Sequence, residues 1–213
     1  MYRTFFMTVY CNNTVKEELK MIEKELLSRV SHTRKSFKDI DFNIHMIRHI
    51  RSYLPTEYRD IVVICIGTDR CTGDALGPLT GTYLSKYSLQ NISVYGTIHN
   101  PVHARNLTET LDTIYSTYEN PFLIAIDASL GKPTSVGYVL SGIGSLEPGT
   151  ALKKDLPNVG DMYIAGIVNI SGFMEFQILQ STRLSIVIDM AQAIAKLLFL
   201  MDQLLDVRET SSQ

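Results

Sequence analysis

The fold is decided by the stretch Ile61-Val62-Val63-Ile64-Cys65-Ile66, which runs straight into the loop Gly67-Thr68-Asp69-Arg70-Cys71-Thr72-Gly73-Asp74-Ala75-Leu76-Gly77. An uninterrupted apolar run of this length, rich in β-branched residues, is typical of a strand that is buried on both faces of a parallel sheet. The glycine-containing loop leads into a predicted helix from Leu76 to Lys86. A strand, a loop and a helix in this order predict one unit of an α/β domain.

The same pattern continues on the C-terminal side of this unit. Strands are predicted over Ile92–Ile98 and Phe122–Ile126, with a helix over Ala104–Tyr118 between them, so the order is βαβαβ with right-handed crossovers. Further predicted elements are strands over Val136–Leu140 and Tyr163–Ile170 and helices over Phe173–Gln180 and Leu184–Leu205. We therefore expect an α/β fold of three α/β/α layers around a mostly parallel sheet.

The first forty residues differ from the rest of the chain in their sequence pattern. A short strand over Arg3–Tyr10 and an amphipathic helix over Thr14–Val30 are predicted there. A second helix over Asp41–Leu54 has Ile44, Ile47, Ile50 and Leu54 on one stripe, which leaves His45 and His49 facing solvent. The expected division is an appendage over residues 1–40 and a hydrolase-like domain over residues 41–213.

Composition excludes several classes of protein. The chain has 213 residues, 45% of them hydrophobic, and a formal net charge of −2. Such a chain is not disordered and has no basic excess with which to bind nucleic acid. Its most apolar stretch, Ala193–Met201, is interrupted by Lys196 and is too short to span a bilayer. Three cysteines make no disulfide framework, and Cys71 is expected to be an incidental loop thiol, so the expected compartment is the cytoplasm.

Chemistry is expected where the predicted parallel strands end, because ligands of open α/β sheets bind beyond the carboxyl ends of the strands. Three loops meet that condition, namely residues 67–77, 99–103 and 127–131. Their polar residues should converge on one site. The residues predicted to bind substrate, including one acidic residue before the last strand, are Gly67, Thr68, Asp69, Gly73, His99, Asn100, Ser129 and Asp161.

Asp74 and Asp127 are the predicted catalytic pair, with His103 beside them. Two carboxyl groups that share a site do not ionise together easily, so one holds a proton while the other activates water. The alternatives are a helix N-cap for Asp74 and a turn cap through Ser129 or Gly131 for Asp127. His103 either hydrogen-bonds a loop carbonyl or joins both aspartates around a divalent metal, although no metal-specific spacing is present.

The segment Ile66–Pro78, which ends in Asp74-Ala75-Leu76-Gly77-Pro78, resembles a motif of the germination protease of spore-forming bacteria and of a smaller family related to it. Ile126-Asp127-Ala128 resembles the second aspartate motif of that family. The resemblance spans roughly residues 43–205. It implies a phosphorylase/hydrolase-like α/β/α fold, shared with the hydrogenase maturation proteases, and catalytic roles for Asp74 and Asp127.

The sequence also departs from these families. In hydrogenase maturation proteases a Glu, an Asp and a His bind nickel or cadmium, but no His stands near Leu156–Asp161 in this chain. No cofactor or metal residue is therefore assigned. The resemblance implies a sporulation-associated peptidase of the cytoplasm or forespore, with a peptide or protein substrate. The alternatives are a non-catalytic peptide- or protein-binding protein that retains the fold, and a metal-dependent hydrolase; self-association is an expectation for any of them.

Overall fold

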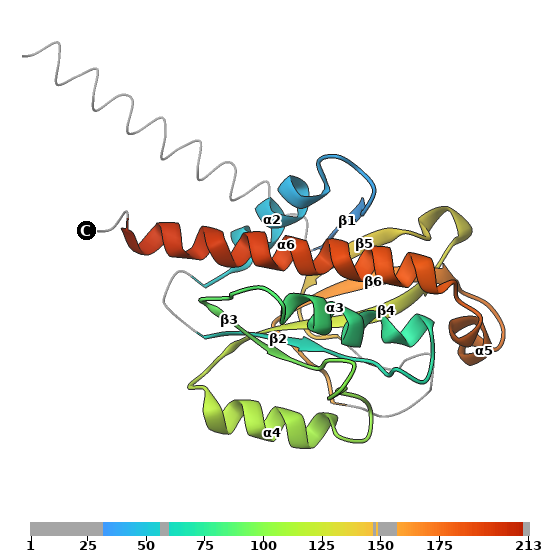
Figure 1. The fold of residues 1–213 in the computed structure, drawn as a ribbon, viewed down its shortest axis with the longest axis horizontal. Helices are drawn as coiled ribbons and strands as arrows, with labels where there is room; N and C mark the ends of the chain where they lie inside the picture. Colours follow the sequence, from blue (N-terminus) through green and yellow to red (C-terminus); the bar gives the residue numbers. More distant parts are fainter. Residues whose placement is uncertain (1–31, 56–59, 147, 149–156, 211–213) are drawn as a thin grey trace, which may run out of the picture. The chain divides into compact units, whose positions relative to one another are not determined.

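The computed structural model describes residues 32–55, 60–146, 148 and 157–210, and these residues form one six-stranded sheet with helices on both faces (Figure 1). The strands lie in the order β1-β5-β6-β4-β2-β3. Their bounds are β1 His32–Ser36, β2 Ile61–Cys65, β3 Ile92–Tyr95, β4 Phe122–Gly131, β5 Tyr138–Ile143 and β6 Met162–Ile170. The predicted three-layer α/β fold is confirmed.

The four strands β6, β4, β2 and β3 are parallel, and they make up the part of the sheet that the apolar runs predicted. All five residues of β2 are buried, as expected for a strand covered on both faces. At the other side β5 runs antiparallel to β6, and β1 runs antiparallel to β5. The sheet is therefore mostly parallel with an antiparallel margin.

Strand β1 corrects the predicted domain boundary. Residues 32–40 were assigned to the appendage, but His32–Ser36 pairs with β5 over its whole length. Its sequence, with Arg34 and Lys35, carries no hydrophobic alternation, and charged residues of this kind suit an edge strand that must not attract a further strand. The domain thus includes residues before 41. The strand and helix predicted over residues 3–10 and 14–30 lie outside the described residues.

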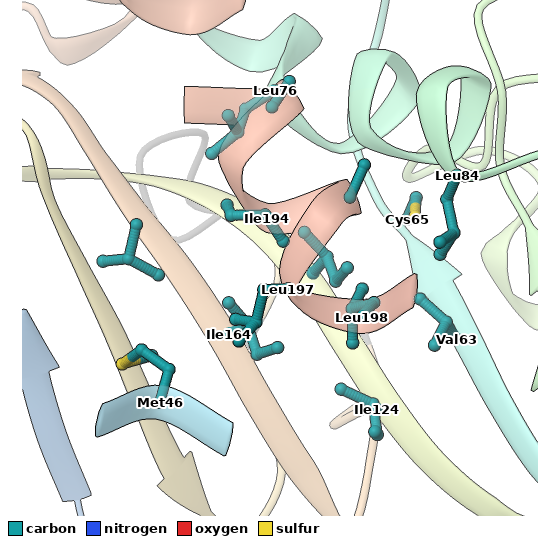
Figure 2. Close-up of a cluster of buried hydrophobic side chains, with 14 of the residues drawn as sticks. Met46, Val63, Cys65, Leu76, Leu84, Ile124, Ile164, Ile194, Leu197 and Leu198 are labelled. Carbon is teal, nitrogen blue, oxygen red and sulfur yellow. The ribbon is translucent and has the colours of Figure 1, made fainter. Parts of the chain in front are cut away.

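Three helices cover one face of the sheet: α2 (Phe42–Tyr53), α3 (Leu76–Leu84) and α6 (Leu184–Thr210) (Figure 1). Figure 2 shows Ile194, Leu197 and Leu198 of α6 packed among buried side chains of the sheet and of α3. By length and composition α6 would also be able to cross a membrane, but these three residues are fully buried in the core. Each such side chain contributes about 1.5–3 kcal/mol by leaving water.

The opposite face carries α4 (Leu107–Thr117), whose Leu107, Leu111 and Ile114 form a second core cluster with β2 and β4. The short helix α5 (Glu175–Gln180) follows β6 and contacts the 3-10 turn η1 (Gly73–Ala75) just before α3. Because η1 contains Asp74, this contact joins α5 to the loop that carries that residue.

In helix α2 the prediction of which side chains are buried and which face solvent is wrong at two positions. Ile44 is exposed and His49 is buried, so the buried stripe consists of Phe42, Met46, His49 and Ile50. The His49 ring meets Tyr53 edge-on at 5.1 Å between centroids, and the ring also hydrogen-bonds the backbone of Ser141. His45 is exposed as predicted, with its Nε2 2.8 Å from the Thr33 hydroxyl.

Candidate active site

A cavity of about 300 Å³ lies at the carboxyl ends of β2 and β4. It brings together six of the residues predicted for the site: Gly67, Thr68, Asp69, Asp74, His103 and Asp127. These residues come from three separate segments of the chain, so their convergence on one cavity follows from the parallel order of the strands.

The loop after β2 is closed by backbone hydrogen bonds. The Gly67 N–H donates to the Val102 carbonyl at 2.8 Å, and the Thr68 N–H donates to the Asp74 carbonyl at 3.1 Å. Gly67 has a φ of +142°, and a Cβ there would lie 2.0 Å from the Asp74 carbonyl oxygen. Only glycine fits this close approach. Gly67 therefore acts through the shape of the loop.

Asp74 lies inside η1, and α3 begins after it without a side-chain cap, so the capping alternative for Asp74 is wrong. Loss of water around the carboxyl group raises the pKa of Asp74 above 3.8, although the Thr68 amide and the nearby His103 ring oppose the change. A carboxyl group with a raised pKa retains its proton more readily, which suits a proton donor.

Asp127 lies within β4, opposite Ala165 of β6, and not directly after the strand as predicted. The strand continues to Gly131, so the turn-cap alternative through Ser129 or Gly131 is also wrong. Asp127 is 8% exposed, and its Oδ1 accepts the Ala128 N–H at 2.7 Å. This hydrogen bond fixes the orientation of the carboxyl group within the strand.

His103 lies at the start of the turn that leads into α4. Its backbone N–H donates to the Asn106 Oδ1 at 2.8 Å, which fixes the residue's position. Among the described residues its ring Nδ1 is buried without a hydrogen-bond partner, so the predicted bond to a loop carbonyl is not made there. The ring is close enough to Asp74 to affect the pKa of that group.

His99 and Asn100 do not line the main cavity. Both are exposed and border a neighbouring cavity of about 500 Å³, which shares Pro101 and His103 with the first. The two histidines of this loop are thus separated, and His103 stands between the two cavities.

Three other predicted site residues lie elsewhere. Asp161 is at the opposite end of the sheet, where its Oδ2 accepts the Leu123 N–H at 2.9 Å. Gly73 packs beneath α5, because a Cβ there would meet Leu179 at 2.8 Å. The Ser129 hydroxyl donates to the Leu130 carbonyl, and neither Ser129 nor Gly73 is among the described residues that line the cavity. Asp161 is a structural residue because it ties β6 to the start of β4.

The cavity also contains residues that were not predicted for the site. Arg70 and Arg105 are exposed side chains on its rim, and Phe176 of α5 forms part of its wall. Cys71 lines it too but is buried, and burial raises the pKa of its thiol. Arg70 and Cys71 were within the predicted loop, whereas nothing in the sequence links Phe176 to the loop after β2.

A metal site is not formed by these side chains. Across the part of the chain that the structure describes, no three or more His, Cys, Asp and Glu residues gather closely enough to hold an ion. Asp74, Asp127 and His103 share a cavity but do not form a set of ligands around one point.

Comparison with known proteins shows the family of this chain and proteins similar to it. The family model described as "Protein of unknown function (DUF1256)" matches residues 34–197. The "Uncharacterized protein YyaC" of Bacillus subtilis (strain 168) is 52% identical over 145 residues, which are 68% of this chain and 71% of that protein. The crystal structure of the [NiFe] hydrogenase maturation protease HycI from Thermococcus kodakarensis KOD1 aligns with a TM-score of 0.45 and 14% identity, over 68% of this chain and 94% of HycI.

Proposed function

The chain belongs to the DUF1256 family, and we propose that it is a peptidase-like hydrolase in which Asp74 and Asp127 together activate a water molecule. One observation carries the proposal: two carboxyl groups from different segments line the same small cavity, and burial raises the pKa of one of them. Pairs of acids held in different environments divide into a proton donor and a proton acceptor.

The two roles follow from the surroundings of each aspartate. Asp127 is the general base, because its Oδ1 already accepts an N–H and its carboxylate is held within a rigid strand. Asp74 is the general acid, because desolvation raises its pKa and favours the protonated form. His103 lies close to Asp74. We propose that its ring lowers the pKa of the Asp74 carboxyl group and so limits the increase that burial causes.

The reaction is hydrolysis of a peptide bond without a covalent enzyme intermediate. Asp127 accepts a proton from water as the water oxygen attacks the carbonyl carbon. Asp74 donates its proton to the amide nitrogen as the carbon–nitrogen bond breaks. The products are a carboxylic acid and an amine, and one further proton transfer from Asp127 to Asp74 through water restores the pair.

The substrate is proposed to be a peptide or protein. On the basis of the resemblance to the germination protease, we propose that the reaction belongs to spore formation, in the cytoplasm or forespore. A single cavity of about 300 Å³ holds only a few residues of such a chain. The exposed side chains of Arg70 and Arg105 stand on the rim, where they would meet the parts of a peptide outside the cavity.

The test uses the purified full-length protein with a library of fluorogenic peptides, and variants Asp74→Asn and Asp127→Asn. Each substitution should reduce kcat/KM by about 10²–10⁴-fold, the usual contribution of a general acid or base. Asp112→Asn, on the exposed side of α4, is the matched control and should retain full activity. Unchanged cleavage by Asp74→Asn would disprove the aspartate mechanism, and peptide binding without any cleavage would establish the binding-protein alternative.

A further inference from the structure

Four large apolar side chains are exposed within the short stretch that leads from β6 into α5. The exposed fractions are 43% for Ile170, 95% for Phe173, 54% for Met174 and 48% for Phe176. Single exposed apolar residues are ordinary, but several in one contiguous stretch mark an interaction surface. We call Ile170, Phe173, Met174 and Phe176 the apolar rim.

The apolar rim is held in place by Asn169. A bulge in β6 leaves Val168 unpaired, because Ile167 pairs with Ser129 and Asn169 with the next residue, Leu130. The Asn169 Nδ2 then donates to the Ile178 carbonyl and lies within hydrogen-bond distance of the Thr182 hydroxyl, both at 3.1 Å. Bulges of this kind redirect one side chain, and here the redirected amide fixes the far end of α5.

The start of α5 is fixed by the left-handed backbone conformation of one residue, Met174. Met174 has a φ of +66°, a left-handed conformation that costs a non-glycine residue free energy. Its carbonyl accepts the N–H groups of Gln177 and Ile178, so the conformation is what turns the chain into α5. Residues in such conformations persist where the surrounding structure enforces them, and they cluster at binding sites.

Helix α5 also packs against the loop that carries Asp74. A Cβ on Gly73 would lie 2.8 Å from the Leu179 side chain and 2.9 Å from the Thr182 hydroxyl, so only glycine allows this contact. Phe176, on the same helix, lines the cavity together with Asp74 and Asp127. The apolar rim therefore shares Phe176 with the cavity wall.

We propose that the apolar rim binds a large apolar side chain of the substrate peptide, next to the bond that is cleaved, and that Asn169 is the positioning residue for this subsite. The inference rests on the proposed peptidase function and adds its specificity. A peptide is the favoured occupant because Phe176 belongs both to the rim and to the cavity wall. A large apolar residue should be preferred over a small polar one by roughly 10–200-fold.

The experiment measures binding and not turnover, so that it is independent of the hydrolytic mechanism. The full-length Asp74→Asn protein is titrated with fluorescein-labelled ten-residue Gly/Ser peptides that carry one Phe at successive positions, and fluorescence anisotropy gives Kd. One position should bind at least 10-fold tighter than the all-Gly/Ser peptide. Phe176→Ser and Asn169→Asp should each reduce that preference to less than 3-fold.

Tyr115→Ser is the matched control, since Tyr115 is an aromatic residue 59% exposed on α4 and outside the residues lining the cavity, and it should keep the preference. Equal binding of all peptides would overturn the apolar subsite and leave the peptidase proposal intact. No binding of any peptide, together with no cleavage by the wild type, would overturn both. Binding of the rim to phosphatidylglycerol vesicles that is lost in Phe173→Ser, without a peptide preference, would assign the surface to a membrane instead.

Discussion

The Thr68 N–H donates to the Asp74 carbonyl oxygen at 3.1 Å, so the loop after β2 closes on the same residue whose carboxyl group we propose to be catalytic. The position of that carboxyl group is thus determined by the backbone of its own loop. Asp74 is also desolvated, which raises its pKa and makes its ionisation unfavourable for the fold. A functional group that is costly for stability is expected at an active site.

Asp74→Asn should therefore make the protein more stable at neutral pH while it removes activity. The pKa of Asp74 is higher in the folded than in the unfolded state, so the folded form is penalised once pH rises above the unfolded value of 3.8. The expected gain at pH 7 is about 0.5–2 kcal/mol, the usual range for stabilising substitutions. Urea unfolding at pH 7 and pH 3.5 measures it, and the gain should disappear at the lower pH. An Asn variant less stable than the wild type at pH 7 would contradict the desolvated carboxyl group.

Gly67→Ala should destabilise the protein by more than about 2 kcal/mol, because it adds to backbone strain a clash with the Asp74 carbonyl oxygen. Gly144→Ala is the matched control. Gly144 also has a positive φ, of +101°, but nothing lies within 4 Å of its would-be Cβ, so only the strain of about 1 kcal/mol is expected. Thermal unfolding of both variants gives the difference, and equal losses would show that the closed loop is not tightly packed.

His49 should make the fold sensitive to mild acid. Burial lowers the pKa of His49 below 6.5, and the nearby His45 and His32 act in the same direction. The unfolded state therefore takes up a proton more readily, and the free energy of unfolding should fall as pH drops through 6.5. His49→Leu should reduce this slope between pH 7.5 and 5.5 in urea titrations. An identical slope in wild type and variant would mean that His49 is protonated equally in both states.

Asp202→Ala should be among the most damaging substitutions on α6. The Asp202 side chain is fully buried and accepts the N–H groups of Gln90 at 3.0 Å and Asn91 at 2.8 Å. Its removal leaves those two donors without this acceptor, at a cost of about 1–3 kcal/mol each. Asp189→Ala, at an exposed position of the same helix, should change stability by less than about 0.5 kcal/mol. Calorimetric unfolding distinguishes the two, and similar effects would contradict a stabilising role for the hydrogen bonds of Asp202.

Apolar runs were sufficient to predict the parallel strands and the edge of the sheet where the cavity lies. The run Ile61–Cys65 is buried throughout, as its short length and its β-branched residues predict for a strand covered on both faces. Because parallel strands end at one edge, the convergence of Asp74, His103 and Asp127 followed from order alone.

What the sequence did not predict depends on contacts between distant residues. β1 is polar because it lies at an edge, so no hydrophobic pattern marks it. His49 is buried because β5 passes over it and provides the Ser141 backbone as a partner. Asp161 was predicted for the site, but it precedes β6 instead of following it. It therefore lies at the end of the parallel strands opposite the cavity. Phe176 reaches the cavity only through the bulge at Val168 and the packing of α5 on Gly73.

The pairing of β1 with β5 has a consequence for biosynthesis. His32 pairs with Gly142, about 110 positions later in the chain. At a translation rate of about 5–20 residues per second, β1 waits roughly 5–20 s on the ribosome before its partner strand is made. During that interval the charges of Arg34 and Lys35 oppose the pairing of this strand with other chains. Replacement of these two charges should therefore affect the yield of folded protein during synthesis more than the stability of the finished fold.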